Sequence, residues 1–146
     1  MTGQDRDHRQ HPQPFAWPLR VYYEDTDVGG VVYYANYLRF LERARTEWLR
    51  ACGTGQQALR EATGGMFVVS DAQLRFHRPA RLDDQLLVTA WPLETGRACL
   101  TIGQQACLGP GPGGVVLCEA TIRIGWVMAP GLRPARIPNE ILKALQ

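Results

Sequence analysis

The chain has 146 residues, of which 45% are hydrophobic and 21% are charged, as is typical of a soluble globular protein. This length predicts one domain, large enough to bury a hydrophobic core. The formal net charge is only +2 and the arginines are scattered, which argues against a nucleic-acid-binding module with its concentrated basic stripe.

The first residues, Met1 to Pro14, are polar, contain prolines and show no hydrophobic period. We expect residues 1–14 to be a disordered tail and residues 15–146 to form a single domain. No secretory signal and no run of about 18 apolar residues is present, so we expect a cytoplasmic protein without a transmembrane segment. The four cysteines show neither a CxxC pair nor zinc spacing, and this predicts reduced packing residues and no metal site.

A first strand is predicted from Phe15 to Glu24, and the hydrophobic period becomes helical from Asn36 onward. The apolar residues of this helix recur at steps of four, three and four, which places them on one face. They are Tyr37, Leu41, Ala44 and Trp48, with Leu38, Arg45 and Leu49 alongside.

The ends of this predicted helix also carry recognisable signals. Asn36 is suited to be the N-cap, because a short polar side chain can accept from the unpaired amides of the first turn. Gly53 fits the left-handed residue that closes a helix. On the outer face, Arg43 and Glu47 are four residues apart and are expected to form an ion pair.

After a short helical piece at Gln56–Ala62, the chain is predicted to form strands. The predicted strands span residues 66–76, 85–91, 97–107 and 116–128, with turns at 92–96 and 109–114 and a short final helix at 138–145. In the first of these strands the even positions are mostly apolar. In the last, alternate residues form an unbroken apolar face, with Trp126 as a core residue. Short connections imply antiparallel pairing, so we predict an α+β fold in which an antiparallel sheet curls around the long helix.

The acidic turn between the first strand and the helix is the strongest candidate site. It contains Glu24, Asp25 and Asp27, and carboxylates this close are expected to raise one another's pKa, as a general base requires. Gly29 and Gly30 would let a backbone approach a ligand. The amides that follow lie at a helix N-terminus, which favours negative charge. This combination predicts acyl transfer or hydrolysis.

Two structural interpretations remain open beside this one. Acidic residues before a helix commonly act as caps and dipole partners, and glycines after a strand commonly just form a turn. Other chemistries have less support, because neither a GxSxG motif nor a Gly-rich phosphate loop is present. His77 is the one histidine outside the tail and is expected at the surface, which leaves a cysteine nucleophile or a hydratase without a base.

Residues 23–49, YEDTDVGGVVYYANYLRFLERARTEWL, resemble the signature of the 4-hydroxybenzoyl-CoA thioesterase family of hotdog-fold proteins. The likeness is greatest to its Tol-Pal-associated, YbgC-type acyl-CoA thioesterases, with the pattern YxxTDxxGxVYxxxYxxxxExAR. Residues 74–90, LRFHRPARLDDQLLVTA, resemble a second segment of that family. Together the resemblance spans Leu19 to Met128.

The resemblance implies a hotdog fold, a homodimer or homotetramer with active sites between subunits, and no cofactor or metal. The catalytic carboxylate of the family's TDxxG turn corresponds to Asp27. The amide that polarises the thioester carbonyl corresponds to the backbone N–H of Tyr34, where many relatives carry histidine. The substrate-binding positions implied are Gly29, Gly30, Val32 and Arg78, with Arg75 and Arg81 as further candidates for the phosphates of CoA.

The activity implied is hydrolysis of acyl-CoA to a free acid and CoA, with acyl-carrier protein as a second acyl donor to consider. Whether Asp27 attacks the thioester or activates water stays open. Glu24, Asp25 and Glu42 are then expected to have supporting roles. The alternative is a non-catalytic acyl-binding or scaffolding subunit linked to the Tol-Pal envelope system, which would allow peripheral association with a membrane.

Overall fold

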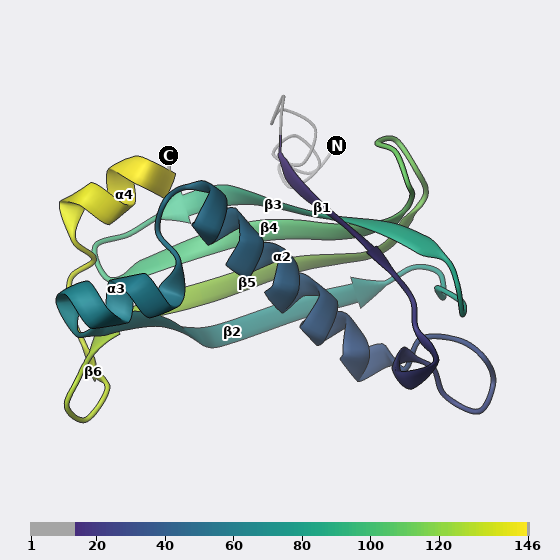
Figure 1. The fold of residues 1–146 in the computed structure, drawn as a ribbon, viewed down its shortest axis with the longest axis horizontal. Coiled ribbons are helices and arrows are strands. Elements are labelled where there is room, and N and C mark those ends of the chain that lie inside the picture. Colours follow the sequence, from purple (N-terminus) through teal and green to yellow (C-terminus); the bar gives the residue numbers. More distant parts are fainter. Residues whose placement is uncertain (1–13, 146) are drawn as a thin grey trace.

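The computed structural model describes residues 14–145, so the tail predicted for residues 1–14 lies outside the described residues except for Pro14. An antiparallel sheet curls around the long helix α2 (Figure 1), as the sequence predicts. In chain order the elements are β1 (Phe15–Arg20), η1 (Tyr23–Asp25), η2 (Tyr34–Asn36), α2 (Tyr37–Ala51), α3 (Gln56–Thr63), β2 (Gly65–Phe76), β3 (Gln85–Thr95), β4 (Cys99–Leu108), β5 (Val116–Met128), β6 (Arg133–Pro134) and α4 (Asn139–Leu145).

The strands lie in the order β1-β3-β4-β5-β2, and all neighbours are antiparallel. The two-residue strand β6, which the sequence did not indicate, pairs with the end of β5. Strands β1 and β2 form the two edges of the sheet. The α+β hotdog architecture is therefore confirmed, with β2 as the edge strand that follows the helices.

The core lies between the inner face of α2 and the concave face of the sheet. The predicted helix face is buried, together with Phe40 and Leu49, whereas Leu38 is 44% exposed and does not belong to it. The apolar face predicted for β5 is confirmed, and Trp126 is 1% exposed. Local periodicity located these two elements because each buries one continuous face.

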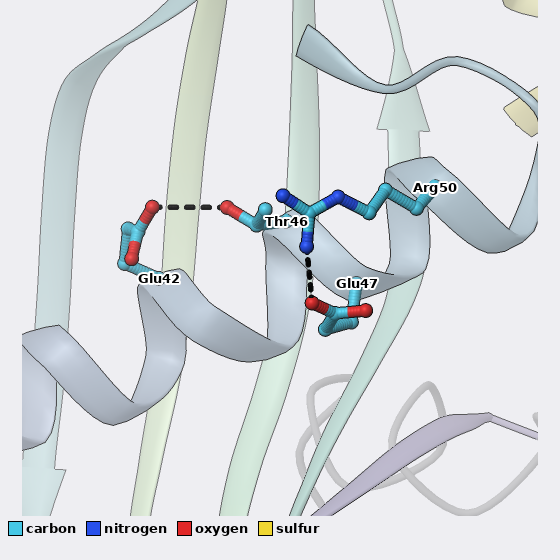
Figure 2. A network of polar contacts seen from close by, with 4 residues as sticks. All are labelled: Glu42, Thr46, Glu47 and Arg50. Carbon is cyan, nitrogen blue, oxygen red and sulfur yellow. Dashed lines mark hydrogen bonds and ion pairs between the residues drawn. The ribbon is translucent and has the colours of Figure 1, made fainter. Parts of the chain in front are cut away.

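The ends and the outer face of α2 differ from the prediction in two respects. The side chain of Asn36 does not cap the helix, because it is used elsewhere, and the helix begins with the 3₁₀ turn η2 instead. Glu47 pairs with Arg50 and not with Arg43, while Thr46 donates to Glu42 (Figure 2). Gly53 has a φ of +78° and closes the helix as predicted.

Strand β3 runs through the turn predicted at residues 92–96. Its pairing with β1 ends at Ala90. Pro92 lies beyond that point, so the N–H that proline lacks is not needed for a hydrogen bond to β1. A proline is tolerated in a strand at such an edge. A bulge after Pro92 then carries the strand to Thr95.

Strand β2 buries a different face from the one predicted. Phe67 packs against Trp126 and is 5% exposed, whereas the even residues Ala72 and Phe76 are exposed. A register shift between Val69 and Asp71 interrupts the alternation. A bulge of this kind exchanges the two faces of a strand, which a strict period of two cannot foresee.

Candidate active site

The segment from Thr26 to Val32 forms a small hairpin before the helix, and its tip, residues 27–30, is exposed. Thr26 and Val32 pair as an isolated bridge, and the amide of Asp27 donates to the carbonyl of Val31 at 2.9 Å. The amide of Gly30 donates back to the carbonyl of Asp27 at 3.0 Å, and Gly30 has a φ of +76°. This left-handed conformation explains why the tight loop requires glycine at that position.

The side chain of Asp27 is exposed at the base of this loop. Its Oδ1 accepts a hydrogen bond from the amide of Gly29 at 2.8 Å. A Cβ added at Gly29 would lie 3.2 Å from the same oxygen, so glycine leaves this contact unhindered. Within residues 14–145, Oδ2 of Asp27 makes no hydrogen bond and is available to a substrate or to water.

The neighbouring carboxylate of Asp25 is used entirely for structure. It is 3% exposed, and its Oδ2 accepts from the amide of Tyr22 at 2.8 Å while its Oδ1 accepts from Nδ2 of Asn36 at 2.8 Å. The tight turn η1 forms around it, which is why the first strand ends at Arg20 and not at the predicted Glu24. The third carboxylate of the turn, Glu24, is exposed.

The start of the helix lies directly after the loop. Tyr33 donates its amide to the carbonyl of Asp25 at 3.0 Å, and the amide of Asn36 donates to the carbonyl of Tyr33 at 2.8 Å. Tyr34 is the first residue of η2, a position where a helix leaves an amide without an acceptor of its own. In the part of the chain that the structure describes, the Tyr34 N–H donates to no other group.

Exposed aromatic rings surround this amide. The rings of Tyr33 and Tyr34 lie 4.9 Å apart, and the ring of Phe76, from the end of β2, meets Tyr34 edge-on at 6.1 Å. The hydrogen bond with the Tyr34 hydroxyl raises the pKa of the exposed Tyr33 hydroxyl. All three rings are 48–62% exposed, so the helix start has an apolar surface around it.

A distant segment supports the loop from the other side. The amide of Val32 donates to the carbonyl of Ala80 at 2.8 Å, and Val31 and Arg81 pair as an isolated bridge. The Tyr37 hydroxyl accepts from the amide of Ala80 at 3.0 Å, and burial raises the pKa of that hydroxyl. This is the second segment of the sequence resemblance, and the fold joins it to the first.

Of the predicted substrate-binding residues, only some lie beside the loop. The side chain of Val32 is 5% exposed within the core. Arg81 is placed next to the loop by its pairing with Val31, whereas the amide of Arg78 donates to Leu117 on β5 at 3.2 Å. Arg75 pairs along β2 with Glu119 of β5, and the same Glu119 accepts from His77 at 3.2 Å. The backbone pairing places Arg81 beside the loop, while the assignment of Arg78 to the substrate stays a prediction.

Two hollows lie away from Asp27. One of about 520 Å³ lies against α3 and the start of β2, and is lined by Gln56, Gln57, Arg60, Glu61 and Met66. A smaller one of about 80 Å³ lies between α2 and β2 and shares Gln56 with the first. Figure 1 places α3 at the opposite end of α2 from the loop, so neither hollow by itself contains the acidic turn.

Residues 14–145 show neither a cluster of metal-ligating side chains nor a membrane-spanning helix. There, no three His, Cys, Asp or Glu side chains gather as metal ligands would, and none of the helices has the length and apolar character needed to cross a bilayer. The four cysteines are free thiols, and burial raises the pKa of Cys118 to about 12. The cytoplasmic location stays a prediction.

Comparison with known proteins decides the family. The sequence profile of the thioesterase superfamily matches residues 29–115. The chain belongs to the thioesterase superfamily. It is 39% identical to the "Acyl-CoA thioesterase YbgC" of Haemophilus influenzae, over 89% of this chain and 93% of that protein. It is 40% identical to the "Acyl-CoA thioester hydrolase YbgC" of Escherichia coli O157:H7, over 88% of this chain and 92% of the relative.

Solved structures agree with this assignment. A probable thioesterase from Bartonella henselae superposes with a TM-score of 0.78 at 31% identity, and covers 86% of this chain and 100% of its own. A 4-hydroxybenzoyl-CoA thioesterase variant in complex with its ligand superposes with a TM-score of 0.82 at 21% identity, over 90% of this chain and 97% of its own. The second likeness shows the fold alone. The family resemblance and the enzyme class predicted from the sequence, a thioester hydrolase, are confirmed.

Sequence reasoning missed two parts of this thioesterase site. It treated Asn36 as a cap, although its amide group holds Asp25. It also left unstated that Ala80 and Arg81 lie against the loop. The resemblance of the RPARLDD segment to a second segment of the family was the one signal that could have indicated the second contact, because neither residue has a distinctive side-chain pattern.

Proposed function

We propose that this thioesterase hydrolyses acyl-CoA to a free carboxylic acid and CoA, with Asp27 as its essential group. The observation that carries the proposal is the contrast in the acidic turn. Both carboxylate oxygens of Asp25 accept structural hydrogen bonds. Asp27 is exposed, and its Oδ1 accepts a hydrogen bond from the amide of Gly29. The YbgC relatives, named as acyl-CoA thioesterases, supply the substrate class.

In this mechanism the carbonyl oxygen of the thioester accepts a hydrogen bond from the N–H of Tyr34. Either the Asp27 carboxylate attacks the carbonyl carbon, or it takes a proton from a water that attacks. The C–S bond then breaks and the electron pair leaves with the CoA sulfur. In the first route water hydrolyses the resulting anhydride and regenerates Asp27. Negative charge collects on the carbonyl oxygen in both routes, and one donor at this position contributes about 10²–10³ in rate.

Asp27→Asn tests the proposal directly. We expect thiol release from acyl-CoA to fall by about 10²–10⁴, because a carboxamide is neither a nucleophile nor a base at neutral pH. Its thermal unfolding should match the wild type, since Asp27 is exposed. Turnover close to that of the wild type would refute the role of Asp27. Tight acyl-CoA binding without thiol release by the wild type would instead favour the non-catalytic alternative.

We further propose that the active site is completed in a homo-oligomer. Strand β2 is a sheet edge with exposed Val69 and Phe76, and an edge strand of 12 residues is suited to pair with a second copy. Light scattering of the purified chain tests this, and a monomer that is fully active would contradict it.

Replacing CoA by acyl-carrier protein in the thiol-release assay tests the second acyl donor. Arg81→Ala should raise KM for CoA thioesters if this arginine meets their phosphates.

A further inference from the structure

Arg45 is a charged residue of the sequence motif that the proposed chemistry does not use. It lies on the sheet side of α2, and its Nη1 donates to Oε1 of Gln104 at 2.9 Å. Gln104 is fully buried and its Nε2 donates to the carbonyls of Leu41 and Thr89 at 3.0 and 3.2 Å. Gln104 is thereby fixed and holds one edge of the guanidinium in place.

The rest of the guanidinium has no partner among residues 14–145. A guanidinium carries five N–H donors, and the described residues provide it with one hydrogen bond and no ion pair within 4.0 Å. Burial lowers the pKa of Arg45, and the nearby Glu42 carboxylate offsets part of this effect. A half-buried cation without a close counter-ion costs folding free energy, and apolar replacements of such groups are often neutral or stabilising.

Arg45 lines the hollow of about 80 Å³ between α2 and β2. The hollow holds about two or three waters, so it can take the end of a ligand but not a whole acyl group. Five of its nine lining residues are apolar and four are polar. The lining residues are Leu49, Phe67, Val68, Val69 and Ile124, with Glu42, Arg45, Thr46 and Gln56.

The position of the hollow relates it to the reaction. Arg45 lies eight residues after Tyr37, about 12 Å along α2 from the helix start. The rings of Tyr34 and Tyr37 contact Phe76 at one end of β2, and the hollow lies beside Phe67 to Val69 nearer its other end. An acyl group held at the Tyr34 amide and directed along the flank between α2 and β2 therefore has to be of at least medium length for its end to reach Arg45.

Building on the acyl-CoA hydrolysis proposed above, we propose that this hollow binds the far end of the acyl group and that Arg45 selects medium-length chains with a hydroxyl there. The hydroxyl oxygen accepts from the free guanidinium donors. The hydroxyl group in turn donates a hydrogen bond to the Glu42 carboxylate, which lines the same hollow. A carboxylate at the chain end would pair with the guanidinium but would also meet the Glu42 carboxylate as a like charge, and a methyl group would leave the guanidinium unpaired.

The test measures thiol release from octanoyl-CoA, ω-hydroxyoctanoyl-CoA and the mono-CoA ester of octanedioic acid. We expect the wild type to show its highest kcat/KM with the hydroxylated chain. Arg45→Met should lower the ratio of hydroxyoctanoyl to octanoyl kcat/KM about 10-fold, the effect of one charge-assisted hydrogen bond. The matched control is Arg43→Met, two residues away on the exposed face of the same helix, which should leave this ratio unchanged.

A second variant keeps the proposal testable should Arg45→Met fail to fold. Glu42 is exposed, and Glu42→Gln removes the like charge, so the ratio of octanedioyl to octanoyl kcat/KM should rise about fivefold. A wild type that prefers octanoyl-CoA, or ratios unchanged in both variants, would overturn the role of Arg45 while leaving the thioesterase proposal intact. If none of the three CoA thioesters released thiol, the proposed function itself would fail.

Discussion

Two neighbouring regions of the candidate site each contain an aspartate carboxylate, buried and hydrogen-bonded in one region and exposed in the other. The brace consists of the buried residues Asp25, Asn36, Tyr37 and Ala80. The Asn36 side chain donates to the Asp25 carboxylate, and the amide of Ala80 donates to the Tyr37 hydroxyl. The loop from Asp27 to Gly30 is exposed throughout. A carboxylate whose oxygens are both occupied stabilises the fold, and one with a free oxygen can react. The brace thus fixes the position of the loop and leaves the Asp27 carboxylate, the group that we propose as reactive, exposed.

After the loss expected for Asp27→Asn, the largest expected effect is at the Tyr34 amide beside the loop. Tyr34→Pro removes the proposed oxyanion donor, and proline is well tolerated at the first position of a helix. The preceding residue, Tyr33, already has an extended backbone with φ −60° and ψ 129°, as a residue before proline requires. We expect kcat to fall about 10²–10³-fold with the fold retained.

Tyr34→Ala is the control for this substitution, because it removes the same ring but keeps the N–H. Its kcat should stay within a few-fold of the wild type, and circular dichroism should show both variants folded. Equal losses in the two variants would assign the effect to the ring, and the proposed donor would then be wrong.

The next prediction distinguishes Asp25 from Asp27 by their effects on the free energy of unfolding. Asp25→Asn replaces a charged acceptor of two hydrogen bonds with an amide whose NH₂ group faces another donor. We expect the free energy of unfolding to fall by about 1.5–3 kcal/mol, measured by urea denaturation. Asp27→Asn should change it by less than about 0.5 kcal/mol, as exposed substitutions do. The reverse order would exchange the roles assigned to these two residues.

Tyr37→Phe tests the link between the brace and the distant segment. It leaves the buried amide of Ala80 without an acceptor, which should cost about 1–2 kcal/mol at pH 7. Because burial raises the pKa of Tyr37, the unfolded chain ionises near pH 10 while the folded chain stays protonated. The wild type should therefore lose stability as the pH rises above 10, and its advantage over Tyr37→Phe should shrink. A constant difference up to pH 11 would contradict this.

The smallest effect concerns the backbone of the loop. Gly30→Ala forces a Cβ onto a residue with φ +76°, although no atom lies within 4 Å of that position. Strain alone should therefore lower the free energy of unfolding by about 1 kcal/mol. Gly111→Ala offers a control, since Gly111 is equally open but lacks a positive φ. Equal changes in the two variants would show that the loop is not strained.

Much of the fold was determined by the sequence itself. The apolar face of α2 from Tyr37 to Trp48 and the alternation along β5 each repeat over several turns or residue pairs, so local periodicity is sufficient to locate them. The motif around Asp27 identified the family, and Gly53 marked the end of the helix because its conformation is a local property.

Only the tertiary structure decided the contacts made across long stretches of sequence. Asn36 turns to Asp25, Arg81 pairs with Val31, and Arg45 meets Gln104, 59 residues away. Pro92 lies within a strand only because β1 ends its pairing at Ala90. A residue's periodicity records which face it occupies, whereas its hydrogen-bond partner depends on how the sheet curls around the helix. The sequence thus located the carboxylate that we propose as reactive, and the fold selected the groups that hold its loop in place.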